Sequence, residues 1–168
     1  MGELFRRGDA IISDCGTYRY RLTRQWGDGP TCGFIMLNPS TADADIDDPT
    51  IRRCIGFAKR EGCGGLVVVN LFALRATDPK ELARHPFPVG PDWRHWLEVT
   101  LPEIDGPLIA GWGAQKGIEG QEATILTLLA EAGRKVMCLG VTQNGSPRHP
   151  LYVKGDAILR ALAKREEE

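Results

Sequence analysis

The sequence predicts an α/β fold in which helices cover both faces of a central, mainly parallel four-stranded sheet, with an N-terminal β-hairpin in front. Four runs, at residues 32–37, 66–72, 107–111 and 135–139, are apolar at nearly every position rather than alternating, with Asn70 and Lys135 as the polar exceptions, and this is typical of strands covered on both faces. Helical patterns lie between these runs, and an alternation of strand and helix favours parallel strands. We therefore expect three layers, α/β/α.

The N-terminal hairpin is predicted from two short apolar segments, 10–12 and 18–22, that are separated by a turn containing Gly16. The second segment alternates aromatic or aliphatic residues with basic ones, so one face is expected to pack and the other to meet solvent. A Gly- and Pro-rich break at 27–30 then separates the hairpin from the rest of the chain.

The helices are predicted from apolar residues at helical spacing and from capping signals. They are expected at residues 48–61, 79–84, 92–101, 119–132 and 155–165. The first begins at Asp47 or Asp48 with Pro49 at its first position, and the fourth ends at Gly133.

The bulk composition narrows the class of protein. Its 168 residues fit one domain, 1–168, with the hairpin in 1–30 and the core in 31–165. The formal net charge of −1 gives no electrostatic reason to expect nucleic acid. No run reaches the roughly 20 apolar residues of a membrane span, and a signal-peptide pattern is missing, so we expect a cytoplasmic monomer without a membrane partner. The five cysteines form no C-x-x-C pair, so neither a zinc knuckle nor an iron–sulfur cluster is indicated.

Ligands of such sheets bind outside the carboxyl ends of the strands. That rule selects four segments, 38–48, 70–77, 111–117 and 142–152, and all four are polar, rich in Gly and Pro, or both. We therefore expect them to form one shared site.

Two asparagines follow buried strands directly. Asn38 precedes Pro39, and its carboxamide can either hold a water by donating and accepting at once or cap the turn; this residue alone favours neither. Asn70 ends an apolar run, and a buried amide must find hydrogen-bond partners. Asn70 therefore either ties a neighbouring loop or binds the polar edge of a ligand.

The later loops carry further candidates. Trp112 stands between two glycines, where it could stack on a ligand, although a lone tryptophan is more often a core residue. The segment GSPRHP at 145–150 concentrates a hydroxyl (Ser146), a guanidinium (Arg148) and an imidazole (His149) in a rigid turn. Packing does not explain three polar groups in a turn that contains two prolines, so we favour a functional role.

The four loops together resemble those of the uracil-DNA glycosylase superfamily, in particular its mismatch-specific and single-strand-selective branches. The segments that carry the resemblance are Met36-Leu37-Asn38-Pro39-Ser40, Val69-Asn70-Leu71, Ala110-Gly111-Trp112-Gly113-Ala114-Gln115 and Asn144-Gly145-Ser146-Pro147-Arg148-His149-Pro150. The chain as a whole is also similar to an uncharacterised bacterial and phage family of unknown function.

The resemblance implies a uracil-DNA-glycosylase-like fold and hydrolysis of the N-glycosidic bond of a flipped, damaged or modified base in DNA, without a cofactor. It implies that Asn38 positions the attacking water and that Asn144 or His149 stabilises charge on the leaving base. The residues that it implies for substrate binding are Pro39, Ser40, Thr41, Asn70, Phe72, Trp112, Gly113, Ser146, Arg148 and Tyr152.

Two alternatives stay open. Asn144 stands where the superfamily often has a histidine, so the same scaffold could be a non-catalytic nucleic-acid or nucleotide-binding module. The aspartates in 43–48 could instead bind Mg²⁺ or Ca²⁺ in a metal-assisted hydrolase, although the glycine and terminal glutamate of an EF-hand loop are missing. A solvated loop that ends in a helix cap is the favoured interpretation of this stretch.

Overall fold

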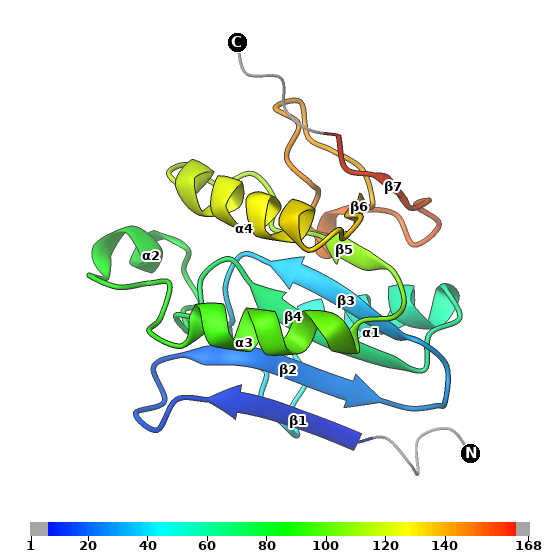
Figure 1. The fold of residues 1–168 in the computed structure, drawn as a ribbon, viewed down its shortest axis with the longest axis horizontal. Helices are drawn as coiled ribbons and strands as arrows, with labels where there is room; N and C mark the ends of the chain where they lie inside the picture. Colours follow the sequence, from blue (N-terminus) through cyan, green and yellow to red (C-terminus); the bar gives the residue numbers. More distant parts are fainter. Residues whose placement is uncertain (1–6, 164–168) are drawn as a thin grey trace.

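The structure is a computed structural model and describes residues 7–163. Within these residues, one mixed sheet has seven strands in the order β1-β2-β4-β3-β5-β6-β7 (Figure 1). The strands are β1 (Arg7–Ile12), β2 (Arg19–Gln25), β3 (Thr31–Met36), β4 (Gly65–Asn70), β5 (Leu108–Ala110), β6 (Met137–Cys138) and β7 (Arg160–Ala161). The helices are α1 (Pro49–Arg60), α2 (Lys80–Arg84), α3 (Trp93–Thr100) and α4 (Glu119–Glu131), with 3-10 turns η2 (Leu101–Glu103) and η3 (Pro150–Tyr152). None of the helices described is long and apolar enough to cross a membrane.

The predicted α/β class is confirmed, but the predicted four-stranded sheet is wrong. Strands β4, β3, β5 and β6, which correspond to the four apolar runs, do pair in parallel. Strand β2 adds to them antiparallel, with Leu22 opposite Val68, and β7 pairs antiparallel with β6. The hairpin is therefore an edge of the main sheet, because β2 satisfies backbone groups along β4 that would otherwise be exposed.

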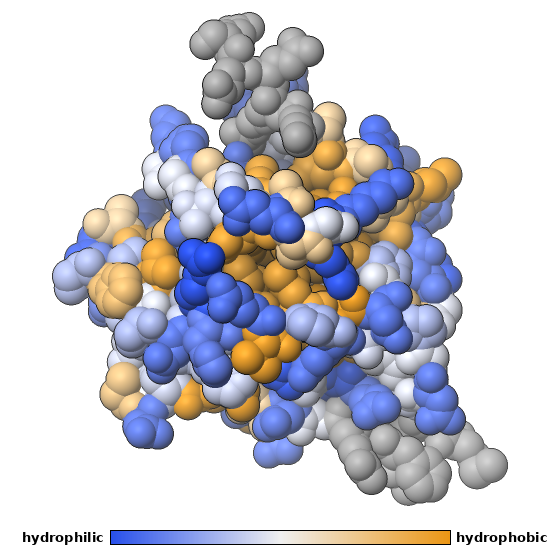
Figure 2. All heavy atoms as spheres, viewed as in Figure 1, coloured by the Kyte–Doolittle hydropathy of each residue, from blue (hydrophilic) through white to orange (hydrophobic). Residues whose placement is uncertain are grey.

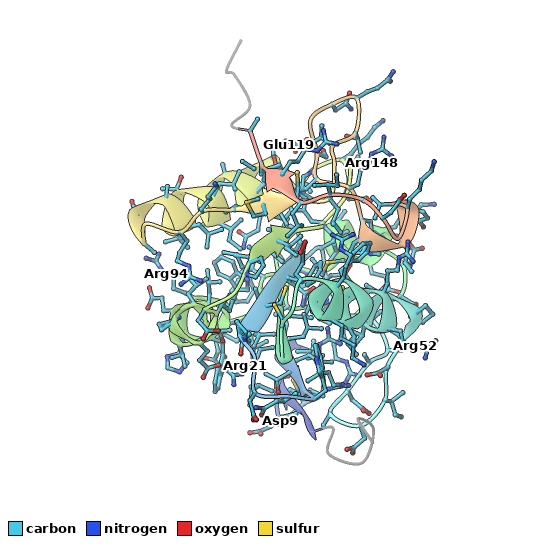
Figure 3. All side chains as sticks on the ribbon, turned by 90° about the vertical axis from the view of Figure 1, so that its right-hand side faces the viewer. Asp9, Arg21, Arg52, Arg94, Glu119 and Arg148 are labelled. Atoms are coloured by element: carbon cyan, nitrogen blue, oxygen red, sulfur yellow. The ribbon has the colours of Figure 1, made fainter. Side chains whose placement is uncertain are left out.

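Helices cover both faces of the sheet, as predicted. Figure 3 views the sheet with α1 on one side and α3 and α4 on the other. Along β4, Val67 and Val69 belong to an apolar cluster shared with α3 and α4, whereas Leu66 and Val68 belong to a cluster shared with α1. Seen from the α3 and α4 side, apolar residues gather in the middle of this face and polar residues surround them (Figure 2). The unbroken apolar character of the strand follows from burial on both faces.

The predicted helix at 155–165 is wrong. Residues 155–156 form a turn, and Arg160 and Ala161 form β7. Residues after 163 lie outside the described part of the chain. Ala157 and Leu159 pack against the cluster of α1, while Ile158 between them is 80% exposed. This alternation has the period of an extended chain, and pairing with β6 supplies the backbone hydrogen bonds that a helix would have made internally.

Candidate functional site

A cavity of about 610 Å³ opens at the carboxyl ends of β3, β4 and β5, as the strand-end rule predicts. Strand β3 comes first of the parallel strands along the chain. The chain next forms β4 on one side of β3 and then crosses to form β5 on its other side, so the strand order reverses at β3. Open α/β sheets form their ligand crevice at such a reversal. The amino end of α1 lines one side of the cavity, and the segment around η3 lines another.

The cavity brings together most of the predicted site residues. Those that line it are Asn38, Ser40, Asn70, Trp112, Gly113, Arg148, His149 and Tyr152. The carboxyl ends of β3, β4 and β5 hold the first members of this group, and the loop that follows β6 supplies the last three.

The Asn70 side chain is buried without partners. It is 2% exposed, and neither Nδ2 nor Oδ1 has a hydrogen-bond partner in the described part of the chain. The backbone at this position is held firmly, because Trp93 Nε1 donates to the Asn70 carbonyl oxygen at 2.8 Å. An unsatisfied buried amide costs roughly 1–3 kcal/mol. Of the two predicted roles, tying a loop is absent among the described residues, so both polar atoms of this carboxamide are unpaired where the residue lines the cavity.

Asn38 has the opposite arrangement. Its Nδ2 donates to the carbonyl oxygens of Pro39 at 3.0 Å and Ala76 at 2.8 Å, so it ties the loop after β3 to the loop after β4. The cap interpretation therefore holds for the amide nitrogen. Oδ1 receives no hydrogen bond from residues 7–163 and remains an acceptor beside the cavity.

Trp112 is a buried core residue that also lines the cavity. The residue is 2% exposed, and its Nε1 donates to Glu122 Oε2 at 2.7 Å, which fixes the ring while it lines the cavity. The neighbouring Gly111 is required for packing rather than for a ligand, because a Cβ there would lie 3.1 Å from both Met36 Sδ and Pro150 Cδ. The glycine thus lets η3 approach the end of β5.

The segment before η3 directs polar groups to the rim of the cavity. His149 Nδ1 accepts a hydrogen bond from the Leu151 backbone N–H at 3.1 Å, so a neutral imidazole carries its proton on Nε2. Burial lowers the pKa of His149, which favours this neutral form. Arg148 is exposed and donates from Nε to the Val141 carbonyl oxygen at 3.0 Å, and Figure 3 shows it on the α1 side of the molecule.

Two buried arginines of β2 were missed: the alternation in 18–22 predicted that the basic residues there, Arg19 among them, face solvent, and Arg24 lies beyond that segment. Arg19 and Arg24 are 2% and 3% exposed. The loop after β3 covers them, and its carbonyl oxygens and Asp47 accept their hydrogen bonds. Arg19 also lines the cavity, and burial lowers its pKa to about 10. The available signal was the acidic stretch that follows β3, which needs cations as partners.

A comparison with protein families matches residues 19–151, from the start of β2 to η3, and the matching family is described as a protein of unknown function, DUF1643. The chain belongs to the DUF1643 family. The matched span contains every residue that lines the cavity except Tyr152. Neither the curated proteins nor the solved structures give a match to the chain.

The remaining predicted residues of this DUF1643 member lie outside the cavity. Pro39 is buried and Thr41 exposed, while Phe72 packs in the cluster of α3 and α4. Asn144 and Ser146 line a separate cavity of about 260 Å³. A turn closed by the hydrogen bond from the N–H of residue 145 to the carbonyl of residue 142 leaves Asn144 exposed at its tip.

In this DUF1643 member, aspartates of the acidic stretch 43–48 accept hydrogen bonds from other residues of the fold. Asp43 Oδ1 accepts two backbone N–H groups, which lower its pKa, and Asp47 Oδ1 accepts from Arg24 Nε at 2.9 Å. Asp48 Oδ1 accepts from the Ile51 N–H at 2.9 Å, so the predicted helix cap is confirmed. Within residues 7–163, no three His, Cys, Asp or Glu side chains gather as metal ligands would.

Proposed function

We propose that this DUF1643 protein hydrolyses the N-glycosidic bond of a nucleotide whose base enters the cavity. One observation supports this most strongly: three buried side-chain polar atoms have no partner among the described residues, and they are Asn70 Nδ2, Asn70 Oδ1 and Arg19 Nε. Both residues line the same cavity. Because native interiors satisfy nearly all such atoms, three in one place indicate a polar ligand that supplies the missing partners.

A nucleobase matches the cavity in size and in polarity. Small-molecule sites occupy roughly 300–1,000 Å³, and this cavity has about 610 Å³. The Asn70 carboxamide offers a donor and an acceptor side by side, which suits the adjacent carbonyl and N–H of a base edge. Met36, Ile51, Val68 and Trp112 offer apolar surface to the faces of the ring.

The reaction requires a placed water and stabilisation of the leaving base. Asn38 Oδ1 would accept a hydrogen bond from the water as its oxygen bonds to the anomeric carbon. The bond from that carbon to the base nitrogen breaks, and the base keeps the electron pair. The Nε2–H of neutral His149 would donate to the base as negative charge develops on it. The base then takes up a proton, and the water releases one.

The resemblance of the four loops to the uracil-DNA glycosylase superfamily supports the same reaction, and a glycosylase-like fold is part of the proposal. The proposed substrate is a flipped base in DNA. Arg148 at the rim would contact a backbone phosphate. Leu151 and Tyr152, which are 42% and 77% exposed, would occupy the gap left in the base stack.

Oligonucleotides test the proposal. Single strands and duplexes carrying uracil, hypoxanthine, xanthine, 5-hydroxymethyluracil or a mismatch are incubated with the protein, and abasic sites are then cleaved with alkali. We expect product from at least one substrate, with a chelator present, and a loss of about 100-fold or more in Asn70→Leu and Asn38→Ala. Gln143→Ala, an exposed residue on the loop after β6, is the control. No product from any substrate would refute hydrolysis, and undiminished product in Asn70→Leu would refute the assignment of the reaction to this cavity.

A binding module without turnover is the second candidate. The observation that favours it is the pair of hydrogen bonds that already occupies Asn38 Nδ2 and leaves only Oδ1 for a water. It predicts binding of an oligonucleotide that is lost in Asn70→Leu, with no abasic product from the wild-type protein. Product formation by the wild-type protein excludes this candidate.

A further inference from the structure

Two arginines of β2 are equally buried but differ in their partners. Arg24 directs Nε to Asp47 at 2.9 Å, and its two other nitrogens donate to backbone carbonyl oxygens. Within residues 7–163, Arg19 makes one side-chain hydrogen bond, from Nη1 to the Ala42 carbonyl oxygen at 2.8 Å. Its Nε has no partner, and neither Nε nor Nη2 pairs with a carboxylate of residues 7–163. Arg24 therefore has a complete structural role, whereas one edge of the Arg19 guanidinium is unused.

The unused edge belongs to a buried charge. The pKa of Arg19, about 10, leaves the guanidinium protonated at neutral pH. A buried cation without a counterion is strongly unfavourable. Asp48 favours the charged form from a distance but forms no ion pair with Arg19, because its carboxylate caps α1. Half-buried Arg75, which also lacks an ion pair within the described range, adds positive charge near Arg19.

The charged residues that line the cavity also favour an anionic ligand. Arg19 and Arg148 are positive and Asp48 is negative, while burial lowers the pKa of His149 and so favours its neutral form. The lining thus has an excess of positive charge. A ligand with an anionic group would balance it and complete the hydrogen bonds of Arg19.

We propose that Arg19 binds a terminal phosphate of the nucleotide inside the cavity, through its Nε and Nη2 edge. The inference rests on the proposed function, since the phosphate belongs to the nucleotide whose base contacts Asn70. The edge of a guanidinium presents two parallel N–H groups that match two phosphate oxygens. Because Arg19 is 2% exposed, a phosphate reaches it only by entering the cavity. A monoester phosphate, on a free nucleotide or at a strand end, can enter in this way, whereas an internal phosphodiester continues into a chain on both sides.

Calorimetry with matched probes tests this inference. The probes are deoxyuridine and the four common deoxynucleosides, each with and without a 5′-phosphate, together with oligonucleotides with and without a 5′-phosphate. We expect the wild-type protein to bind a phosphorylated probe at least about tenfold more tightly than its unphosphorylated counterpart. Arg19→Gln should abolish that difference and retain the weaker binding, and Arg19→Lys should retain part of the difference. Arg52→Gln, an exposed arginine of α1 outside the cavity (Figure 3), is the control.

Each outcome decides the inference. A preference for free monophosphates identifies a mononucleotide, and a preference for phosphorylated oligonucleotides alone identifies a strand end. No phosphate preference in the wild-type protein, or a preference that survives in Arg19→Gln, would overturn the proposal. If Arg19→Gln does not fold by circular dichroism, Arg19→Lys replaces it, and an undiminished preference there counts against the role. Phosphate binding through Arg19, with neither abasic product nor free base released from a nucleoside 5′-monophosphate, refutes hydrolysis alone, while abasic product without a phosphate effect refutes this inference alone.

Discussion

Replacing Asn70 by leucine should stabilise the protein while it destroys the site. Leucine has nearly the same shape as asparagine but no polar atoms, and the cavity leaves room for its extra volume. The wild-type residue buries Nδ2 and Oδ1 at 2% exposure without partners among the described residues. Removing these two unpaired atoms should raise the free energy of unfolding by about 2 kcal/mol. For a chain of this size, that change raises the melting temperature by about 4–8 °C.

Asn38 provides the matched control, because its amide nitrogen makes two hydrogen bonds. Asn38→Leu leaves the Ala76 carbonyl without its donor and should lower stability by about 1–3 kcal/mol. Both variants are compared with the wild-type protein by urea denaturation and by thermal unfolding without ligand. If Asn70→Leu loses stability to the same extent as Asn38→Leu, the Asn70 amide is satisfied within the fold, and the reasoning that reserves it for a ligand is wrong.

Three further predictions concern the frame of the cavity. Gly111→Ala places a Cβ 3.1 Å from Pro150 Cδ and should destabilise the protein by about 1–3 kcal/mol, measured by urea denaturation. Asp48→Ala removes the cap of α1 and should cost about 0.5–2 kcal/mol, whereas Asp45→Ala at an exposed position should change little. Burial lowers the pKa of His149 below its ordinary 6.5, so the unfolded chain binds the proton first as the pH falls. Stability should therefore be complete above pH 6.5 and decline as the pH falls below it, and His149→Gln should show a smaller decline in melts across that range.

Local sequence signals predicted the elements that frame the site. The aspartate and proline at the start of α1 predicted its first turn, because a side-chain cap and a fixed φ act within a few residues. Asn38 and Asn70 were predicted as site residues because each follows an apolar run, and both line the cavity. The C-terminal helix was predicted wrongly, because the apolar residues there satisfy an alternating pattern once β6 offers an edge for pairing.

The sequence by itself determined the α/β class, the four parallel strands and the end of the sheet where polar residues gather, since apolar runs and strand-end polarity are properties of short segments. The tertiary structure alone decided which of those polar groups remain without partners. Asn38 and Asn70 are alike in sequence, yet one ties two loops together and the other has no partner in the described fold. Arg19 and Arg24 are alike too, and only the path of the loop after β3 separates them. Hydrogen bonding between distant segments depends on how they meet in space, and that information is not local to any of them.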